Sequence, residues 1–274
     1  MPFVRAGALD VGYEVRGAGP PMVMLHGATS SGREDWAAQV PLFGRSFLVY
    51  LPDARGHATT RWDVSDGFSA ELLVDDVEAL ADVLGLSTFH LVGFSMGAMT
   101  ALRFAIRHPE RLRTLALSGI STEREPRLSV ARRLMDVSRI EAEEPAWAAE
   151  LAARHDPVQG RGAWRRLLEA IVADVVIERM PSPAELRRVD LPILVAAGDR
   201  DPFVPVDQAW RLARAVPDGR LLVAPDCPHE VMVRRAGMFN AACGGFFRST
   251  ESIARQRAAS RRPAHPPDDH GGVR

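Results

Sequence analysis

The most informative run of the chain spans residues 89–107 and reads FHLVGFSMGAMTALRFAIR. Its start, residues 89–92, is almost continuously apolar, as in a strand buried on both faces. From Met96 to Arg107 the pattern is typical of a helix, which His108 and the proline after it end. Between strand and helix lies Gly93-Phe94-Ser95-Met96-Gly97, a G-x-S-x-G motif in the strand–turn–helix context that this motif requires.

This turn predicts a reactive serine. A sharp strand-to-helix turn keeps the Ser95 hydroxyl exposed, and the helix start offers unpaired N–H groups to a developing negative charge. Gly93 and Gly97 let neighbouring backbone approach closely. The alternative is a glycine-rich turn in which Ser95 only caps the helix.

Strands and helices alternate on both sides of this run. Predicted strands cover residues 8–15, 22–25, 47–51, 112–117, 193–197 and 220–223, and predicted helices cover residues 69–84, 206–216 and 231–247. This alternation predicts an α/β fold with a mainly parallel central sheet flanked by helices.

The alternation is interrupted at residues 121–188, where no convincing strand occurs. Helical patterns at 127–140, 146–153 and 162–180 are separated there by prolines. We therefore predict a helical cap, residues 121–188, inserted into an α/β core of residues 1–120 and 189–248. Residues 249–274 are rich in Arg, Ala, Pro and His, and are predicted to form a frayed helix end followed by a disordered tail.

Composition and charge narrow the class of protein. The chain has 274 residues, 46% of them hydrophobic and 25% charged, with 34 basic and 35 acidic residues. These values are ordinary for a globular protein, and they argue against global disorder and a coiled coil. Because no excess of positive charge exists, we expect no non-specific binding of nucleic acid or of an anionic membrane.

Two cysteines, Cys227 and Cys243, are too few for a disulfide framework. They could pair only with each other, and free thiols in a reducing cytosol are the favoured interpretation. Neither has ligands at zinc-like spacing, so we predict no metal and no cofactor. Residues 83–102 are the longest stretch without Asp, Glu or Arg, but their glycines and serines fit a strand–turn–helix better than a membrane span. We predict a cytoplasmic protein whose partner is a small molecule; the oligomeric state stays open.

Five segments, taken in order, carry a family resemblance: LHGA (25–28), PDARGH (52–57), GFSMG (93–97), GDRD (198–201) and CPH (227–229). Together they resemble the α/β-hydrolase fold family over roughly residues 8–247. The pattern is most similar to bacterial serine hydrolases of the enol-lactonase, cofactor-free haloperoxidase and carbon–carbon bond hydrolase types. One departure is visible, because the family's arginine loop usually continues with Gly and, two residues on, Ser. Here it reads His57-Ala58-Thr59-Thr60, which leaves the shape of this loop open.

A serine hydroxyl needs a base, and His229 fits that role best. It follows the last predicted strand and precedes the final helix, in the family order nucleophile, acid, histidine. The resemblance implies a structural role for His26 and His57, which lie in family loops. The alternative for His229 is an ordinary loop histidine at a helix N-terminus.

The acid should follow the strand at residues 193–197, where Asp199 and Asp201 are both candidates. The resemblance places the acid at Asp201, and Asp199 then forms the turn. A third possibility is an acid after the earlier strand, near Glu123. The acid orients His229 and stabilises its imidazolium without taking the proton.

The resemblance also implies an oxyanion hole made of two backbone N–H groups. One belongs to Met96, directly after the nucleophile, and the other to Ala28, after the His26-Gly27 pair. His26, Gly27, Gly93 and Gly97 would support the site; the alternative for Gly27 is an ordinary turn glycine.

These residues are compatible with three functions. The leading one is a serine hydrolase that cleaves a small ester or lactone with an apolar portion through an acyl-enzyme. The second is a carbon–carbon bond hydrolase of a vinylogous diketone, using the same residues. The third is a non-catalytic small-molecule-binding protein. Dehalogenase and epoxide-hydrolase activities are disfavoured, since relatives of those kinds have Asp where this chain has Ser95.

Overall fold

The structure is a computed structural model that describes residues 2–260, with side chains described for residues 2–252. Within this part of the chain, eight strands form one sheet in the order β1-β2-β4-β3-β5-β6-β7-β8. β1, β2 and β4 are paired antiparallel to one another, and the remaining neighbours are parallel. The predicted α/β fold with a mainly parallel sheet is confirmed.

The strands are β1 (Phe3–Ala6), β2 (Leu9–Gly17), β3 (Pro21–Leu25), β4 (Leu48–Pro52), β5 (Phe89–Phe94), β6 (Leu112–Ser118), β7 (Pro192–Gly198) and β8 (Asp218–Ala224). The helices are α1 (Gly32–Asp35), α2 (Val40–Phe43), α3 (Ala70–Val83), α4 (Met96–Arg107), α5 (Arg127–Leu134), α6 (Val137–Glu143), α7 (Pro145–Gln159), α8 (Ala163–Ile177), α9 (Pro183–Leu186), α10 (Val206–Ala215), α11 (Val231–Arg234) and α12 (Ala236–Ser260), with short 3-10 helices at Val64–Asp66 and Pro109–Arg111.

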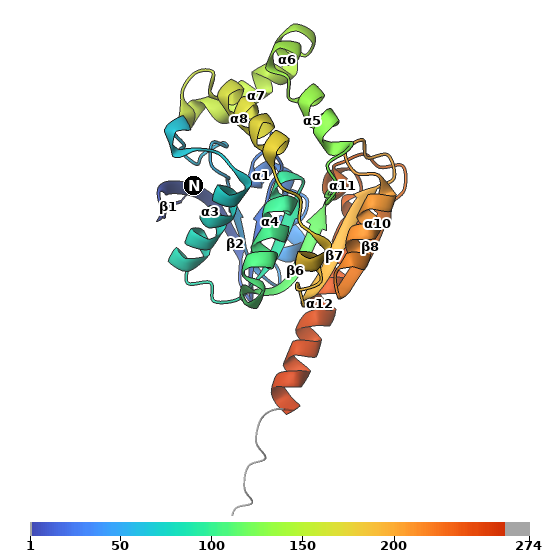
Figure 1. Ribbon diagram of the computed structural model, residues 1–274. Coiled ribbons are helices and arrows are strands. Elements are labelled where there is room, and N and C mark those ends of the chain that lie inside the picture. Colours follow the sequence, from blue (N-terminus) through green and yellow to red (C-terminus); the bar gives the residue numbers. More distant parts are fainter. Residues whose placement is uncertain (1, 261–274) are drawn as a thin grey trace, which may run out of the picture.

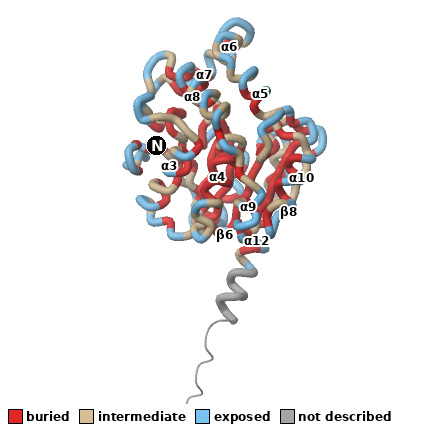
Figure 2. Tube along the Cα trace, viewed as in Figure 1, coloured by how far each residue is buried: buried red, intermediate tan, exposed pale blue. Residues whose placement is uncertain are grey.

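Each face of the sheet packs against its own set of helices. In β3, Val23 and Leu25 join the core cluster on the side of α3, α4 and α10, whereas Met22 and Met24 join the cluster that includes α12. This follows from the alternation of side chains along a strand. Buried residues therefore concentrate in the strands and in α4 (Figure 2). The two-sided burial explains why the central strands are continuously apolar in sequence.

Between β6 and β7 the described chain contains helices only, α5 to α9, which we call the helical insertion. Its helices α5 to α8 lie over the end of the sheet from which α4 departs (Figure 1), whereas Leu186 of α9 joins the core cluster on the side of α4. The single helix predicted at 127–140 is wrong in detail, because α5 ends at Leu134 and Asp136 starts α6 by accepting the amide hydrogen of Arg139. The break predicted around Pro157 is also wrong, since α7 continues through Pro157 to Gln159. The predicted cap bounds, residues 121–188, stay a prediction.

The two ends of the core differ from the prediction. The short strand β1, which was not predicted, pairs with β2 and forms the edge of the sheet. α12 continues to Ser260, beyond the tail start predicted at residue 249. Glu251 explains part of this extension, because its carboxylate lies 3.0 Å from Arg113 of β6. The rest of the predicted tail, residues 261–274, lies outside the described residues.

Two further observations concern the whole described chain. Cys227 and Cys243 are both buried and free, as the sequence predicts. Among residues 2–260, no helix is both long enough and apolar enough to cross a membrane.

Candidate active site

The turn between β5 and α4 holds Ser95 in a strained conformation. Its backbone has φ 52° and ψ −113°, a region that residues other than glycine rarely adopt. The amide of Ser95 donates to the carbonyl of Ser118 in β6 (2.9 Å), and that of Gly97 donates to the carbonyl of His26 (3.1 Å). The neighbouring segments thus hold the turn in place.

Gly93 and Gly97 are required by close packing at this turn. A Cβ atom on Gly93 would lie 2.3 Å from the Gly97 carbonyl oxygen, and one on Gly97 would lie 2.5 Å from the carbonyl oxygen of Leu25. Both contacts are with backbone, which has no room to move. Only glycine therefore fits at either position.

Ser95, His229 and Asp201 form one chain of hydrogen bonds. The Ser95 Oγ lies 2.9 Å from His229 Nε2, and His229 Nδ1 lies 2.7 Å from Asp201 Oδ2. The other carboxylate oxygen of Asp201 accepts the amide hydrogens of Phe203 (2.8 Å) and Val204 (3.1 Å). Because these bonds hold the carboxylate, His229 Nδ1 is the donor and Nε2 faces the serine as an acceptor.

The other two candidate acids have different contacts. Asp199 Oδ1 accepts the amide hydrogen of Cys227 (3.1 Å), and so ties the loop after β7 to the loop after β8. Glu123 pairs with Arg211 (2.6 Å) at the surface. Within the described residues, only Asp201 of the three is hydrogen bonded to His229.

Two backbone amides next to Ser95 are unpaired. In the described part of the chain, neither the N–H of Ala28 nor that of Met96 donates a hydrogen bond. Both residues line the same cavity as Ser95. Gly27, directly before Ala28, donates its own amide hydrogen to the buried carboxylate of Asp35 (2.8 Å). The arrangement offers two N–H donors of the kind that an oxyanion hole uses.

Two aromatic rings flank His229. The ring centres of Phe203 and Phe94 lie 4.4 Å and 5.0 Å from that of the histidine. They form an apolar wall that limits access of water to the imidazole. The sequence analysis did not single out either residue, and a phenylalanine beside a motif has no signal that separates it from a core residue.

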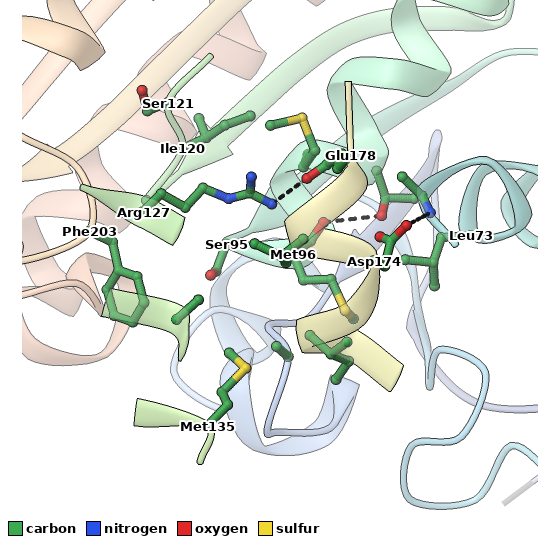
Figure 3. Close-up of a pocket in the computed structure, with 18 of the residues that line it drawn as sticks. Leu73, Ser95, Met96, Ile120, Ser121, Arg127, Met135, Asp174, Glu178 and Phe203 are labelled. Atoms are coloured by element: carbon green, nitrogen blue, oxygen red, sulfur yellow. Dashed lines mark hydrogen bonds and ion pairs between the residues drawn. The ribbon is translucent and has the colours of Figure 1, made fainter. Parts of the chain in front are cut away.

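Ser95 and His229 lie where two cavities meet. The inner cavity has a free volume of about 50 Å³ and runs beneath α8. The outer cavity has about 280 Å³ and is bordered by the loop after β3 and by the insertion. Ala28, Met135 and Phe203 also line both cavities. Figure 3 shows the inner cavity, with Ser95 and Met96 between Phe203 on one side and Asp174 and Leu73 on the other.

The inner cavity is mainly apolar but has a charged wall. Arg127 of α5 lies 2.5 Å from the buried carboxylate of Glu178 (Figure 3). The same carboxylate also binds Arg103 of α4 (3.1 Å). Asp174 of α8 accepts the amide hydrogen of Ala70 at the start of α3 (3.2 Å). Burial raises the pKa of Asp174 above its usual value. The sequence analysis missed these residues, because each pair joins segments far apart in the chain.

The large apolar residues of the insertion divide into two groups. Ile140 and Trp164 are buried within the insertion, as ordinary packing predicts. Leu134, Met135 and Trp147 line the outer cavity. The insertion therefore supplies part of the wall next to Ser95.

The supporting histidines lie beside the loop after β3. His26 Nε2 accepts the amide hydrogen of Ala54 (2.9 Å), and its Nδ1 lies 2.7 Å from the carbonyl oxygen of Gly27. The two ring nitrogens of His57 face the carbonyl oxygens of Arg55 and Ala28, each at 2.9 Å. Burial holds the pKa of His57 well below its usual value. Ala58 has φ 38°, so the loop keeps a left-handed residue at the position where the family usually has Gly.

Comparisons with known proteins agree with this fold. A family model described as alpha/beta hydrolase fold matches residues 20–153. The 2-hydroxy-6-oxononadienedioate/2-hydroxy-6-oxononatrienedioate hydrolase 1 of Dechloromonas aromatica (strain RCB) is 29% identical, over 86% of this chain and 91% of that protein.

Two solved structures are also similar. Est816, described as an N-acyl homoserine lactone degrading enzyme, is 26% identical with a TM-score of 0.73, covering 89% of this chain and 100% of that one. The enol-lactonase from Burkholderia xenovorans LB400 is 23% identical with a TM-score of 0.69, covering 90% of this chain and 99% of that one. The chain has the α/β-hydrolase fold and is a hydrolase.

Proposed function

We propose that the chain is a serine hydrolase that cleaves a small ester or lactone through an acyl-enzyme. The hydrogen-bonded chain from Ser95 through His229 to Asp201, beside two unpaired amides, is the observation that supports this most strongly. Ser95 is the nucleophile, His229 the general base and Asp201 the group that orients it.

The proposed reaction uses His229 twice. Ser95 Oγ attacks the carbonyl carbon while His229 Nε2 takes the hydroxyl proton, and Asp201 stabilises the imidazolium that forms. The N–H groups of Ala28 and Met96 donate to the oxyanion. When the tetrahedral intermediate collapses, His229 returns the proton to the leaving oxygen. Water then repeats the sequence on the acyl-enzyme and releases the acid.

The two cavities support a small substrate with an apolar portion. The inner cavity is narrow, so one side of the scissile bond must be small or flat. The larger outer cavity, lined by Leu134, Met135 and Trp147, suits the larger apolar side. A small-molecule partner and a cytoplasmic location, which fits two free thiols, are part of this proposal.

A carbon–carbon bond hydrolase is an equally supported alternative. The relative from Dechloromonas aromatica is named as a hydrolase of a 2-hydroxy-6-oxo dienedioate, which is a vinylogous diketone. The same serine, histidine and carboxylate suit attack on its ketone carbonyl. Only turnover of one substrate class against the other separates the two activities.

Labelling with a fluorophosphonate, read by intact mass and peptide mapping, tests the shared part of both proposals. We expect labelling at Ser95 in the wild type and none in Ser95→Ala. His229→Ala should label at least about 10²-fold more slowly, because the hydroxyl then lacks its base. Asp201→Asn should lower kcat by about 10³- to 10⁴-fold.

Asp199→Asn is the matched control, since Asp199 lies two residues from Asp201 and bonds only to a loop amide. Full esterase activity in Ser95→Ala would overturn the proposal. A parallel screen of esters, lactones and 2-hydroxy-6-oxo dienoates then assigns the substrate class.

A further inference from the structure

The loop after β3 is held at the amide of Gly27 and at the carbonyl oxygens of Gly27, Ala28 and Thr29. The amide of Gly27 donates to Asp35 (2.8 Å), and its carbonyl oxygen lies 2.7 Å from His26 Nδ1. The carbonyl oxygen of Ala28 lies 2.9 Å from His57 Nε2. The carbonyl oxygen of Thr29 accepts a hydrogen bond from Arg154 (2.7 Å). Within residues 2–252, the N–H groups of Ala28 and Thr29 donate no hydrogen bond, and of these two residues Ala28 alone lines the inner cavity with Ser95.

The direction of that N–H follows from the groups around it. A trans peptide is planar, so the Ala28 N–H points opposite to the Gly27 carbonyl. His26 fixes that carbonyl, because its Nε2 accepts the Ala54 amide hydrogen and its single ring hydrogen must then lie on Nδ1. His26 and Asp35 thus hold the Gly27 end of the loop, and the other end is held separately.

The second half of the loop depends on the helical insertion. The turn that closes residues 27–30 has a long hydrogen bond, from the amide of Ser30 to the carbonyl of Gly27 (3.4 Å). His57 is neutral and carries one hydrogen for two carbonyl oxygens, so it donates to only one of Arg55 and Ala28. Because Arg154 is always charged, it is a permanent hydrogen-bond donor to this half of the loop.

Arg154 is itself held in place. It lies on α7, in the insertion, and its Nε is 2.5 Å from a carboxylate oxygen of Glu34 in α1. α1 also carries Asp35, which fixes Gly27. The side chain of Arg154 is only 18% exposed. One arginine thus connects the insertion, α1 and the loop that carries the Ala28 amide.

We propose that Arg154 is a positioning residue for the oxyanion hole: its hydrogen bond to Thr29 couples docking of the insertion to the placement of the Ala28 N–H. This inference rests on the proposed function. A substrate that orders the insertion thereby brings the Ala28 N–H into place for its own reaction. When the insertion is undocked, this oxyanion donor is misplaced. Removing one oxyanion donor costs about 10²- to 10³-fold in rate, so loosening one should cost about 10- to 100-fold.

Arg154 also lines the outer cavity, which suggests a competing role in binding substrate directly. The two roles differ in what they change. A substrate-binding arginine contributes equally before and in the transition state, and its loss raises KM. A positioning arginine acts on the oxyanion, and its loss lowers kcat.

The test compares an ester with the thionoester that has the same acyl and alcohol parts. Sulfur is a larger and weaker hydrogen-bond acceptor than oxygen, so the ratio of their kcat/KM values reports on the oxyanion hole. In Arg154→Ala we expect kcat for the ester to fall about 10- to 100-fold, KM to stay within about two-fold, and the ester preference to fall about as much as kcat. Arg154→Lys, which keeps a charged donor, should recover part of the loss.

Arg165→Ala is the matched control, because Arg165 forms an ion pair within the insertion, with Glu141, and does not touch the loop. Arg165→Ala should change neither kcat for the ester nor the preference for the ester over the thionoester. Arg154→Met keeps much of the side-chain volume and replaces Arg154→Ala should the latter not fold. The rate of fluorophosphonate labelling at Ser95 gives a second readout and should fall in parallel.

Three results would overturn the inference while leaving the proposed function intact. They are a raised KM with unchanged kcat, an unchanged ester preference, and an equal loss in Arg165→Ala. Absence of both labelling and turnover in the wild type would instead overturn the proposed function, and this inference with it.

Discussion

Ala58 stores strain beside the site. Its φ of 38° lies in the left-handed region, where a Cβ atom is disfavoured by about 1–2 kcal/mol. The conformation is imposed by its neighbours: the amide of Ala58 donates to His155 Nδ1 (3.1 Å), and the flanking Thr59 bonds to Asp53 through its hydroxyl (2.6 Å). The loop therefore keeps its shape without the glycine expected there.

Replacing Ala58 by glycine should stabilise the protein. Glycine removes the steric strain and gives back part of that gain through greater freedom in the unfolded chain, so Ala58→Gly should raise the free energy of unfolding by about 0.5–1 kcal/mol. Urea unfolding checks this. Ala153→Gly, at an exposed position inside α7, should have the opposite sign, about 1 kcal/mol of destabilisation. Equal signs for the two variants would contradict this account of Ala58.

At the scale of elements, one of the contacts that join the insertion to the core is made by a buried carboxylate. Glu178, just after α8, has a side chain only 2% exposed and lies between Arg103 of α4 and Arg127 of α5. Arg103 also bonds to the backbone of Arg179. The insertion thus ends on a charge cluster next to the inner cavity.

Removing that carboxylate should be strongly destabilising. Glu178→Ala leaves Arg103 buried without its main partner, which costs about 3–5 kcal/mol. Glu178→Gln keeps a hydrogen-bond acceptor and should lose less. Chemical unfolding of these variants is compared with Glu141→Ala, which breaks an exposed ion pair of the same insertion and should cost less than about 1 kcal/mol. Similar losses for Glu178→Ala and Glu141→Ala would mean that the buried cluster is not what joins insertion and core.

The elements also show what a single sequence can and cannot predict. Strands β3 to β7 and helix α4 were predicted within one or two residues, because strands covered on both faces are continuously apolar. The short strand β1 was missed, since Phe3 and Arg5 are exposed and only Ala6 is fully buried. The break between α5 and α6 was also missed, because Asp136 reads equally well as a helix residue and as a cap.

The candidate site likewise contains residues that were predicted from the sequence and residues that were not. Ser95, Asp201 and His229 were predicted from the motif at Ser95 and from the family resemblance, and the structure joins the three side chains by hydrogen bonds. Arg154, Asp35 and Phe203 were not, although each contacts the site. These residues lie on other elements, and the sequence around each of them does not indicate that it contacts the site. The sequence did not reveal which residues from distant segments contact one another in the folded chain.

At the scale of the whole molecule, buried histidines make the protein sensitive to acid. Burial lowers the pKa of His155 to about 4, and that of His90 to about 4 as well. His155 packs against His57 with ring centres 5.4 Å apart, and near His26, Arg154 and Asp156. Burial and the positive charge of Arg154 oppose protonation of His155, whereas Asp156 favours it.

The sign of the pH effect follows from proton binding. A folded-state pKa near 4 lies below the unfolded value of about 6.5, so the folded protein binds fewer protons and becomes less stable as the pH falls between these values. His155→Asn keeps an acceptor for the Ala58 amide but cannot be protonated. Its free energy of unfolding should therefore fall less steeply from pH 6.5 to pH 4 than that of the wild type, measured by urea unfolding at each pH. An unchanged slope would show that His155 does not titrate on unfolding.

The strained turn at Ser95 has a consequence for the chain while it is being made. Its geometry is held by the carbonyls of His26 and Ser118, and His229 arrives more than a hundred residues later. A nascent or truncated chain that ends before β8 holds the serine but no base to activate it. Reactivity therefore appears only when almost the whole described chain is in place. An activity-based label on Ser95 would then count completed molecules, and incomplete chains would stay unlabelled.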